Sequence, residues 1–216
     1  MKTTVSKVCV GGAKIVNHGN AEINTGIFKT AQSASVAISE AGLLGDVQVD
    51  LRFHGGKDKA VYVYPDSHYD YWRNELGLTQ LEDAQFGENI NVSGIDDSAV
   101  VIGDRFQLGS AIVEVTQPRI PCFKLGIRLQ DDSFPAKFLL AGKLGFYLRV
   151  EKPGEVEQGD GFELLSRGNS GITVADLWRV TFTNTDESEL AQRALDELAY
   201  LDEGWRKRLA SRVHND

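Results

Sequence analysis

The sequence predicts a mainly β fold that is followed by three short helices. The chain has 216 residues, with 22 glycines and only 5 prolines, which favours many tight turns between short strands. Segments in which apolar and polar residues alternate recur along most of its length. After Arg167 the composition changes to a linker-like stretch and then to helical patterns. We therefore expect one main domain over residues 1–168 and a small three-helix domain over residues 169–216.

The expected strands follow from alternation and from turn residues at their ends. In residues 46–54, Val47 and Val49 share one face with two later apolar residues, while polar residues occupy the other. Residues 17–27 look like a turn or an excursion, and residues 108–111 (LGSA) predict a hairpin. The other expected strands are residues 5–16, 33–39, 61–64, 100–102, 105–108, 112–115 and 145–150.

A weak internal repeat accompanies two of the turns. The pattern V-x-x-G-D-x-F-x-L begins at Val100 and again at Val156. Nine positions are too few for a repeat architecture. We expect two similar corners, in each of which Gly-Asp makes a turn before a strand.

Helices are expected in two parts of the chain. Asp66 or Ser67 can cap a helix that continues through Leu76, and Ser133 with Pro135 can open a short helix over residues 133–143. In the last quarter, the spacing of Thr173 and Asp176 predicts a capping box for residues 174–180, a helix is expected over 186–201, and Asp202 can cap a third.

Composition excludes several classes of protein. A net charge of −8 and a pI near 5.1 argue against a general nucleic-acid binder. The two cysteines, Cys9 and Cys122, form no CxxC or zinc spacing, and a reducing cytosol suits them best. No signal-peptide core or membrane-length apolar run is visible, so we expect a cytoplasmic protein that binds no membrane.

The most informative stretch is residues 117–124 (QPRIPCFK). Two prolines stiffen the backbone around Cys122, and Arg119 and Lys124 flank it. No acidic residue occurs between Val115 and Gln130, although the whole chain is acidic. Nearby cations favour a thiolate, the reactive and metal-binding form of cysteine. Either an anionic ligand lies beside a reactive sulfur, or Cys122 is a buried cysteine with solvated basic neighbours.

Two further loops carry candidate ligand groups. Residues 54–60 (HGGKDKA) combine bare glycine backbone with lysines, which suits a phosphate, although a plain glycine turn fits equally. Residues 86–90 (FGENI) offer an amide at Asn89 and close approach at Gly87, or simply the entry to a strand. Cys9, between two valines, is expected to be a structural thiol, with a redox role as the alternative.

The ordered set of these motifs, with VIGD at residues 101–104, resembles the MOSC domain, the C-terminal domain of molybdenum-cofactor sulfurases. The resemblance is strongest to its YiiM-like branch, which is associated with hydroxylaminopurine resistance. It implies an antiparallel β-barrel with short peripheral helices and a three-helix C-terminal domain. It also implies a molybdopterin-type molybdenum cofactor, with the Cys122 thiolate on the metal. The implied cofactor-binding residues are His54, Gly55, Gly56, Lys59, Phe86, Gly87, Glu88, Asn89, Gln117, Arg119 and Lys124.

The resemblance further implies an oxidoreductase that converts N-hydroxylated compounds, such as hydroxylaminopurine-type bases, to amines. Electrons would come from a separate reductase, for which residues 169–216 are a candidate docking surface. The alternatives are a non-catalytic carrier of the cofactor or of sulfur on Cys122, and a protein-interaction module that uses the helical tail. The chain departs from the family at Lys57, where proline is frequent.

Overall fold

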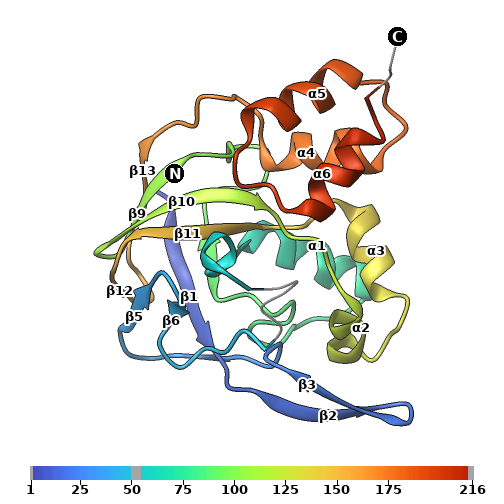
Figure 1. Ribbon diagram of the computed structural model, residues 1–216. Helices are drawn as coiled ribbons and strands as arrows, with labels where there is room; N and C mark the ends of the chain where they lie inside the picture. Colours follow the sequence, from blue (N-terminus) through green and yellow to red (C-terminus); the bar gives the residue numbers. More distant parts are fainter. Residues whose placement is uncertain (1, 50–54, 214–216) are drawn as a thin grey trace.

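The computed structural model describes residues 2–49 and 55–213, and its elements are labelled in Figure 1. The strands are β1 (Thr4–Val10), β2 (Lys14–His18), β3 (Ala21–Thr25), β4 (Thr30–Ala31), β5 (Val36–Ser39), β6 (Gly42–Leu43), β7 (Val61–Pro65), β8 (Ile90–Ser93), β9 (Arg105–Leu108), β10 (Ala111–Pro118), β11 (Phe146–Lys152), β12 (Gly154–Val156) and β13 (Phe162–Ser166). The helices are the 3₁₀ turn η1 (Lys57–Lys59), α1 (Asp66–Leu76), α2 (Phe123–Leu129), α3 (Phe134–Ala141), α4 (Val174–Phe182), α5 (Ser188–Glu197) and α6 (Glu203–Ala210).

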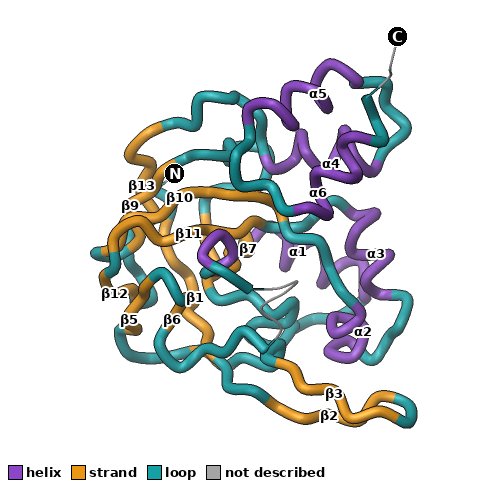
Figure 2. Tube along the Cα trace, viewed as in Figure 1, coloured by secondary structure: helices purple, strands orange, loops and turns teal. Residues whose placement is uncertain are grey.

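An eight-stranded sheet dominates the fold, in the order β13-β9-β10-β11-β7-β8-β1-β4. Neighbouring strands in this sheet are antiparallel, except β7 and β8, which are parallel. Strand β1, next to the β4 edge, approaches the turn before β13 at the other edge, where the Val5 amide donates to the Asp160 carbonyl at 2.9 Å. Among the described residues no closed barrel is found, and helices make up much of the chain. The fold is therefore mixed α and β with a large sheet (Figure 2), and the predicted mainly β barrel is not confirmed.

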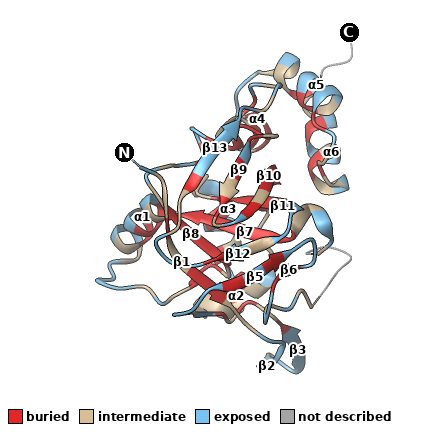
Figure 3. Cartoon of the chain, turned by 90° about the vertical axis from the view of Figure 1, so that its left-hand side faces the viewer, coloured by how far each residue is buried: buried red, intermediate tan, exposed pale blue. Residues whose placement is uncertain are grey.

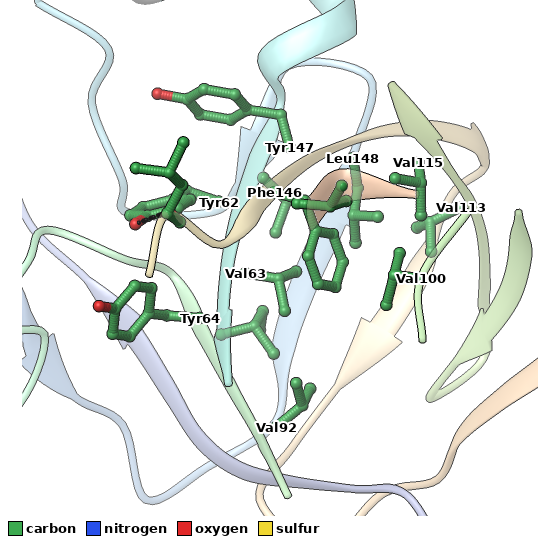
Figure 4. Packing of buried hydrophobic residues seen from close by; sticks show 14 of the residues in the cluster. Tyr62, Val63, Tyr64, Val92, Val100, Val113, Val115, Phe146, Tyr147 and Leu148 are labelled. Carbon is green, nitrogen blue, oxygen red and sulfur yellow. Dashed lines mark hydrogen bonds between the residues drawn. The ribbon is translucent and has the colours of Figure 1, made fainter. Parts of the chain in front are cut away.

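The pairing of β7 with β11 separates the core from the face that carries the pocket. Phe146 lies opposite Val63, and Tyr147 lies opposite Tyr62 one residue along. Because successive side chains on a strand point to opposite faces, the two pairs project in opposite directions. Figure 4 shows Val63 and Phe146 among the core valines, with the two tyrosines on the other side. The tyrosine rings lie 5.4 Å apart between centroids.

The two corners of the internal repeat have the same turn, as predicted. The Val101 amide donates to Asp104 Oδ2 at 2.9 Å, and the Glu157 amide donates to Asp160 Oδ2 at the same distance. The glycine before each aspartate has a positive φ, 90° and 94°, which only glycine adopts without strain. The following strands pair with each other as β9 and β13.

The three C-terminal helices pack against one end of the large sheet (Figures 1 and 3). The predicted capping box of α4 is present, since Thr173 accepts from the Asp176 amide and Asp176 accepts from the Thr173 amide. Asp202 caps α6 through the Trp205 amide, also as predicted. Trp205 is fully buried and belongs to the same core cluster as the sheet.

Several predicted boundaries are wrong. Residues 17–27 contribute most of the β2–β3 hairpin, because strands that contain β-branched residues flank a two-residue turn. Residues 46–49 form no strand, and residues 50–54 lie outside the described part of the chain. Neither Asp66 nor Ser67 caps α1, since Pro65 holds the cap position and Asp66 accepts a hydrogen bond from Ser6 instead. Ser133 and Pro135 do open α3 as predicted, although the Ser133 hydroxyl donates to Asp131 and makes no cap hydrogen bond. Helix α5 is shorter than the predicted range 186–201.

Candidate functional site

One hollow brings together residues from all three loops that the sequence singled out. Its empty space, including the open mouth, is about 650 Å³. The predicted residues on its wall are Lys59, Gly87, Asn89, Arg119, Cys122 and Lys124. The wall also contains Thr25, Gly26, Ile27, Lys29, Asp46, Val47, Gln48, Val49, Tyr62 and Tyr147.

Cys122 lies between the stiff loop and α2. It occupies the N-cap position of that helix, is half-buried, and forms no disulfide. The loop before it is fixed at its start, because the Arg119 amide donates to the Gly145 carbonyl at 3.3 Å and the Trp205 indole donates to the Pro118 carbonyl at 3.0 Å. At its end, the Leu125 amide donates to the Cys122 carbonyl at 2.9 Å. The thiol therefore has a defined place on the pocket wall.

Arg119 connects the cysteine loop to the FGENI loop. Its side chain is buried, Nη1 donates to the Phe86 carbonyl, and the guanidinium lies 4.6 Å from the centroid of the Tyr62 ring. Burial by itself would lower the pKa of Arg119, but the Tyr62 and Tyr147 hydroxyls raise it above its ordinary value. The charge of Arg119 is thus permanent and held in one position.

The FGENI residues divide into wall and support. Gly87 has a φ of 82°, and a Cβ there would lie 2.7 Å from Ile27, so no larger residue fits without movement. The Asn89 amide is already used, because Oδ1 accepts from the Tyr62 amide at 3.1 Å and Nδ2 donates to Asp46 at 2.9 Å and to the Cys9 carbonyl at 3.3 Å. Asn89 therefore holds the wall together rather than presenting donors to a ligand.

Phe86 and Glu88 face away from the hollow. Phe86 packs in an aromatic cluster with Trp72 and Tyr69. Glu88 is fully buried, accepts from the Tyr69 hydroxyl and, at 3.1 Å, from the Phe86 amide. Burial raises the pKa of Glu88. These contacts give both residues a structural place, and neither reaches the pocket wall.

The HGGKDKA loop contributes Lys59 to the wall, whereas Gly55 and Gly56 are not part of it. Gln48 fixes this loop, since it accepts from the Gly56 amide at 3.2 Å and donates to the Lys59 carbonyl at 2.9 Å. His54, predicted to bind the cofactor, lies outside the described residues. Gln117, also predicted, is buried away from the hollow and bonds Asp202 of the C-terminal segment.

The wall also contains a buried ion pair that the sequence does not predict. Lys29 Nζ pairs with Asp46 Oδ1, and both side chains are 7% exposed. Asp46 also accepts from the Gly11 amide at 3.0 Å. Burial lowers the pKa of Lys29, an effect that Asp46 opposes. Lys29 belongs to no recognisable motif, and only the folded chain brings it to Asp46. The two tyrosines of the wall, Tyr62 and Tyr147, lie in predicted strands and were not assigned to the site.

The charges on the wall favour an anion. Among the described residues of the wall, Lys29, Lys59, Arg119 and Lys124 are cationic and Asp46 is the one carboxylate. Lys124 makes no hydrogen bond or ion pair with any described residue, so its charge is available to a ligand. Within residues 2–49 and 55–213, no three His, Cys, Asp or Glu side chains are grouped so as to hold a metal ion.

Comparison with known proteins agrees with this geometry. The model of the MOSC domain family matches residues 50–163, more than half of the chain. This chain belongs to the MOSC family. It is 39% identical to the uncharacterized protein YflK of Bacillus subtilis over 94% of this chain and 91% of the relative. It is 33% identical to the protein YiiM of Escherichia coli over 86% and 83%.

Other similarities support the fold and the reaction class. The crystal structure of YiiM from Geobacillus stearothermophilus superimposes with a TM-score of 0.79 at 28% identity, covering 98% of this chain and all of that one. A protein of Gibberella moniliformis named "Reductase" is 34% identical over 74% of this chain, but only 29% of its own length is matched. Together these relatives support an oxidoreductase-like, YiiM-like MOSC protein. No described helix has the length and apolarity needed to cross a membrane.

Proposed function

We propose that this MOSC protein is an oxidoreductase that binds a molybdopterin-type molybdenum cofactor and reduces N-hydroxylated compounds, such as hydroxylaminopurine-type bases, to amines. The observation that carries the proposal is the hollow in which Cys122 meets four cations. The donor set fits the cofactor, because a thiolate is a suitable ligand for a soft metal centre and the cations suit its phosphate and oxo groups. MOSC membership and the relative named as a reductase support the reaction class.

Each residue then has a task that follows from its place. Cys122 supplies the sulfur ligand, and Arg119, held by the Phe86 carbonyl, offers a fixed charge to an anionic group. Lys124 adds a further charge on the first turn of α2. When bound, the cofactor supplies a metal that can accept an oxygen atom and two electrons. The overall reaction, R–NHOH + 2e⁻ + 2H⁺ → R–NH₂ + H₂O, requires a separate electron-donating reductase, and residues 169–216 are proposed as its docking surface.

The test is anaerobic reduction of 6-hydroxylaminopurine with an artificial electron donor. Cys122→Ser replaces the soft ligand, and we expect turnover to fall by about 100-fold or more. Cys9→Ala is the matched control, because Cys9 is fully buried away from the hollow. Full activity of Cys122→Ser would refute the mechanism. Molybdenum bound without turnover would favour the carrier alternative.

A further inference from the structure

A carboxylate from the C-terminal helices contacts the pocket that the sheet and its loops build. Asp202 Oδ2 lies 2.6 Å from Lys59 Nζ, and the two side chains are 33% and 13% exposed. Lys59 lines the hollow beside Cys122 and also a second hollow, which lies between residues 117–121 and α6. The ion pair therefore stands at the boundary between the two spaces.

Asp202 is also held by hydrogen bonds to Gln117 of β10 and to its own helix. Its amide donates to Gln117 Oε1 at 2.8 Å, and Gln117 Nε2 donates back to Asp202 Oδ2 at 3.3 Å. Its other carboxylate oxygen accepts from the Trp205 amide at 2.9 Å, which caps α6. Burial by itself would raise the pKa of Asp202, but hydrogen bonds from Lys59, the Trp205 amide and Gln117 lower it below its ordinary value. Asp202 is thus held on three sides and is ionised at neutral pH.

We infer that Asp202 is a positioning residue, through which the C-terminal helices hold the Lys59 ammonium in place at the cofactor pocket. The inference rests on the proposed function for the identity of the ligand. It also explains why Gln117 faces α6 and not the ligand, since Gln117 fixes Asp202. A lysine side chain has several rotatable bonds, so the loss of the Asp202 contact would let the ammonium contact an anionic group for a smaller part of the time.

The test is molybdenum retention after gel filtration in a double-mutant cycle of Asp202→Asn and Lys59→Gln. Asparagine still caps a helix, so α6 is preserved while the charge is removed. We expect Asp202→Asn to speed molybdenum loss by about 10-fold in the wild-type background and to have no effect in Lys59→Gln. Glu203→Gln removes a charge from the same turn without touching Lys59, and should match wild type. Thermal midpoints, measured in parallel, should be alike for the Asp202 and Glu203 variants.

Two results would overturn the inference. If Asp202 only subtracts charge from the pocket, Asp202→Asn will slow the loss of molybdenum. If it acts only through the helix, the effect will be equal in both Lys59 backgrounds. Wild type without molybdenum would instead contradict the proposed function. In that case the cycle is read in the metal-free protein, as the phosphate concentration that protects Cys122 from iodoacetamide. Asp202→Asn should raise this protective phosphate concentration about 10-fold when Lys59 is present, and should leave it unchanged in Lys59→Gln. No rise in the presence of Lys59 would refute the inference.

Discussion

At the scale of single residues, a buried ion pair that the sequence does not predict holds the pocket wall together. Lys29 and Asp46 form an ion pair that is almost inaccessible to water. Asp46 also accepts hydrogen bonds from Asn89 and the Gly11 amide. Removal of one partner leaves a buried charge without compensation, which is more costly than the loss of an exposed pair.

We therefore predict that Asp46→Ala lowers the free energy of unfolding by about 3 kcal/mol, as measured by urea denaturation. The exposed pair of Glu203 and Lys207 provides the control, and Glu203→Ala should unfold at the wild-type urea concentration. Equal effects of the two substitutions would show that Lys29 finds another partner.

A second buried pair makes a pH prediction. His68 Nε2 lies 3.8 Å from Asp97 Oδ2, and burial lowers the pKa of His68 to about 3 and raises that of Asp97 to about 7. Between the ordinary values of 3.8 and 6.5, the folded pair keeps one proton on Asp97 and the unfolded pair keeps one on His68. The pair then contributes almost no pH dependence in this range, because both states bind the same number of protons.

Single substitutions should reveal the opposite contributions of His68 and Asp97 to the pH dependence of stability. In Asp97→Asn the unfolded state binds the extra proton, so stability should fall as pH drops from 6.5 to 3.8, by up to about 1.4 kcal/mol per pH unit. In His68→Gln the folded state binds it, so stability should fall as pH rises from 3.8 towards 7. Denaturation at a series of pH values measures both, and identical profiles for the two variants would contradict the assignment.

At the scale of elements, the two repeated corners differ in the burial and the hydrogen bonds of their aspartates. Asp104 is fully buried and accepts from the Val101 and Gly168 amides and from Arg167. Asp160, at the equivalent position, is half-buried. We predict that Asp104→Ala costs about 3 kcal/mol and Asp160→Ala about 1 kcal/mol in chemical denaturation. A larger cost at Asp160 would mean that the corner near β1 matters more than the corner near α4.

Elements with a local chemical signal could be predicted from the sequence, and elements with only a distant partner could not. The capping box at Thr173 and the cap at Asp202 form within a few residues of chain, and the structure confirms both. Residues 46–49 alternate like a strand but pair with no other strand, because Asp46 and Gln48 bind neighbouring loops instead. In the same way, the loops at Cys122 and Asn89 could be selected from sequence, whereas Lys29 and Asp202 reach the site only through folding.

At the scale of the whole molecule, the C-terminal helices share the core of the sheet. Ile172, Leu177 and Trp205 are buried in the same cluster as the strands. We predict that a chain lacking residues 169–216 loses its cooperative thermal transition, because this surface would face water. A truncated chain with the wild-type midpoint would contradict this and support an independent domain at residues 1–168. Point substitutions on the outer face of the helices are therefore the sharper test of reductase docking.

The most direct test of the account is the molybdenum content of the anaerobically purified protein, compared between wild type and Cys122→Ser. We predict about one molybdenum per chain in wild type and in Cys9→Ala, and almost none in Cys122→Ser, whose thermal midpoint should equal that of metal-free wild type. Equal molybdenum in Cys122→Ser and wild type, or none in any of the three proteins from a cofactor-producing host, would contradict it.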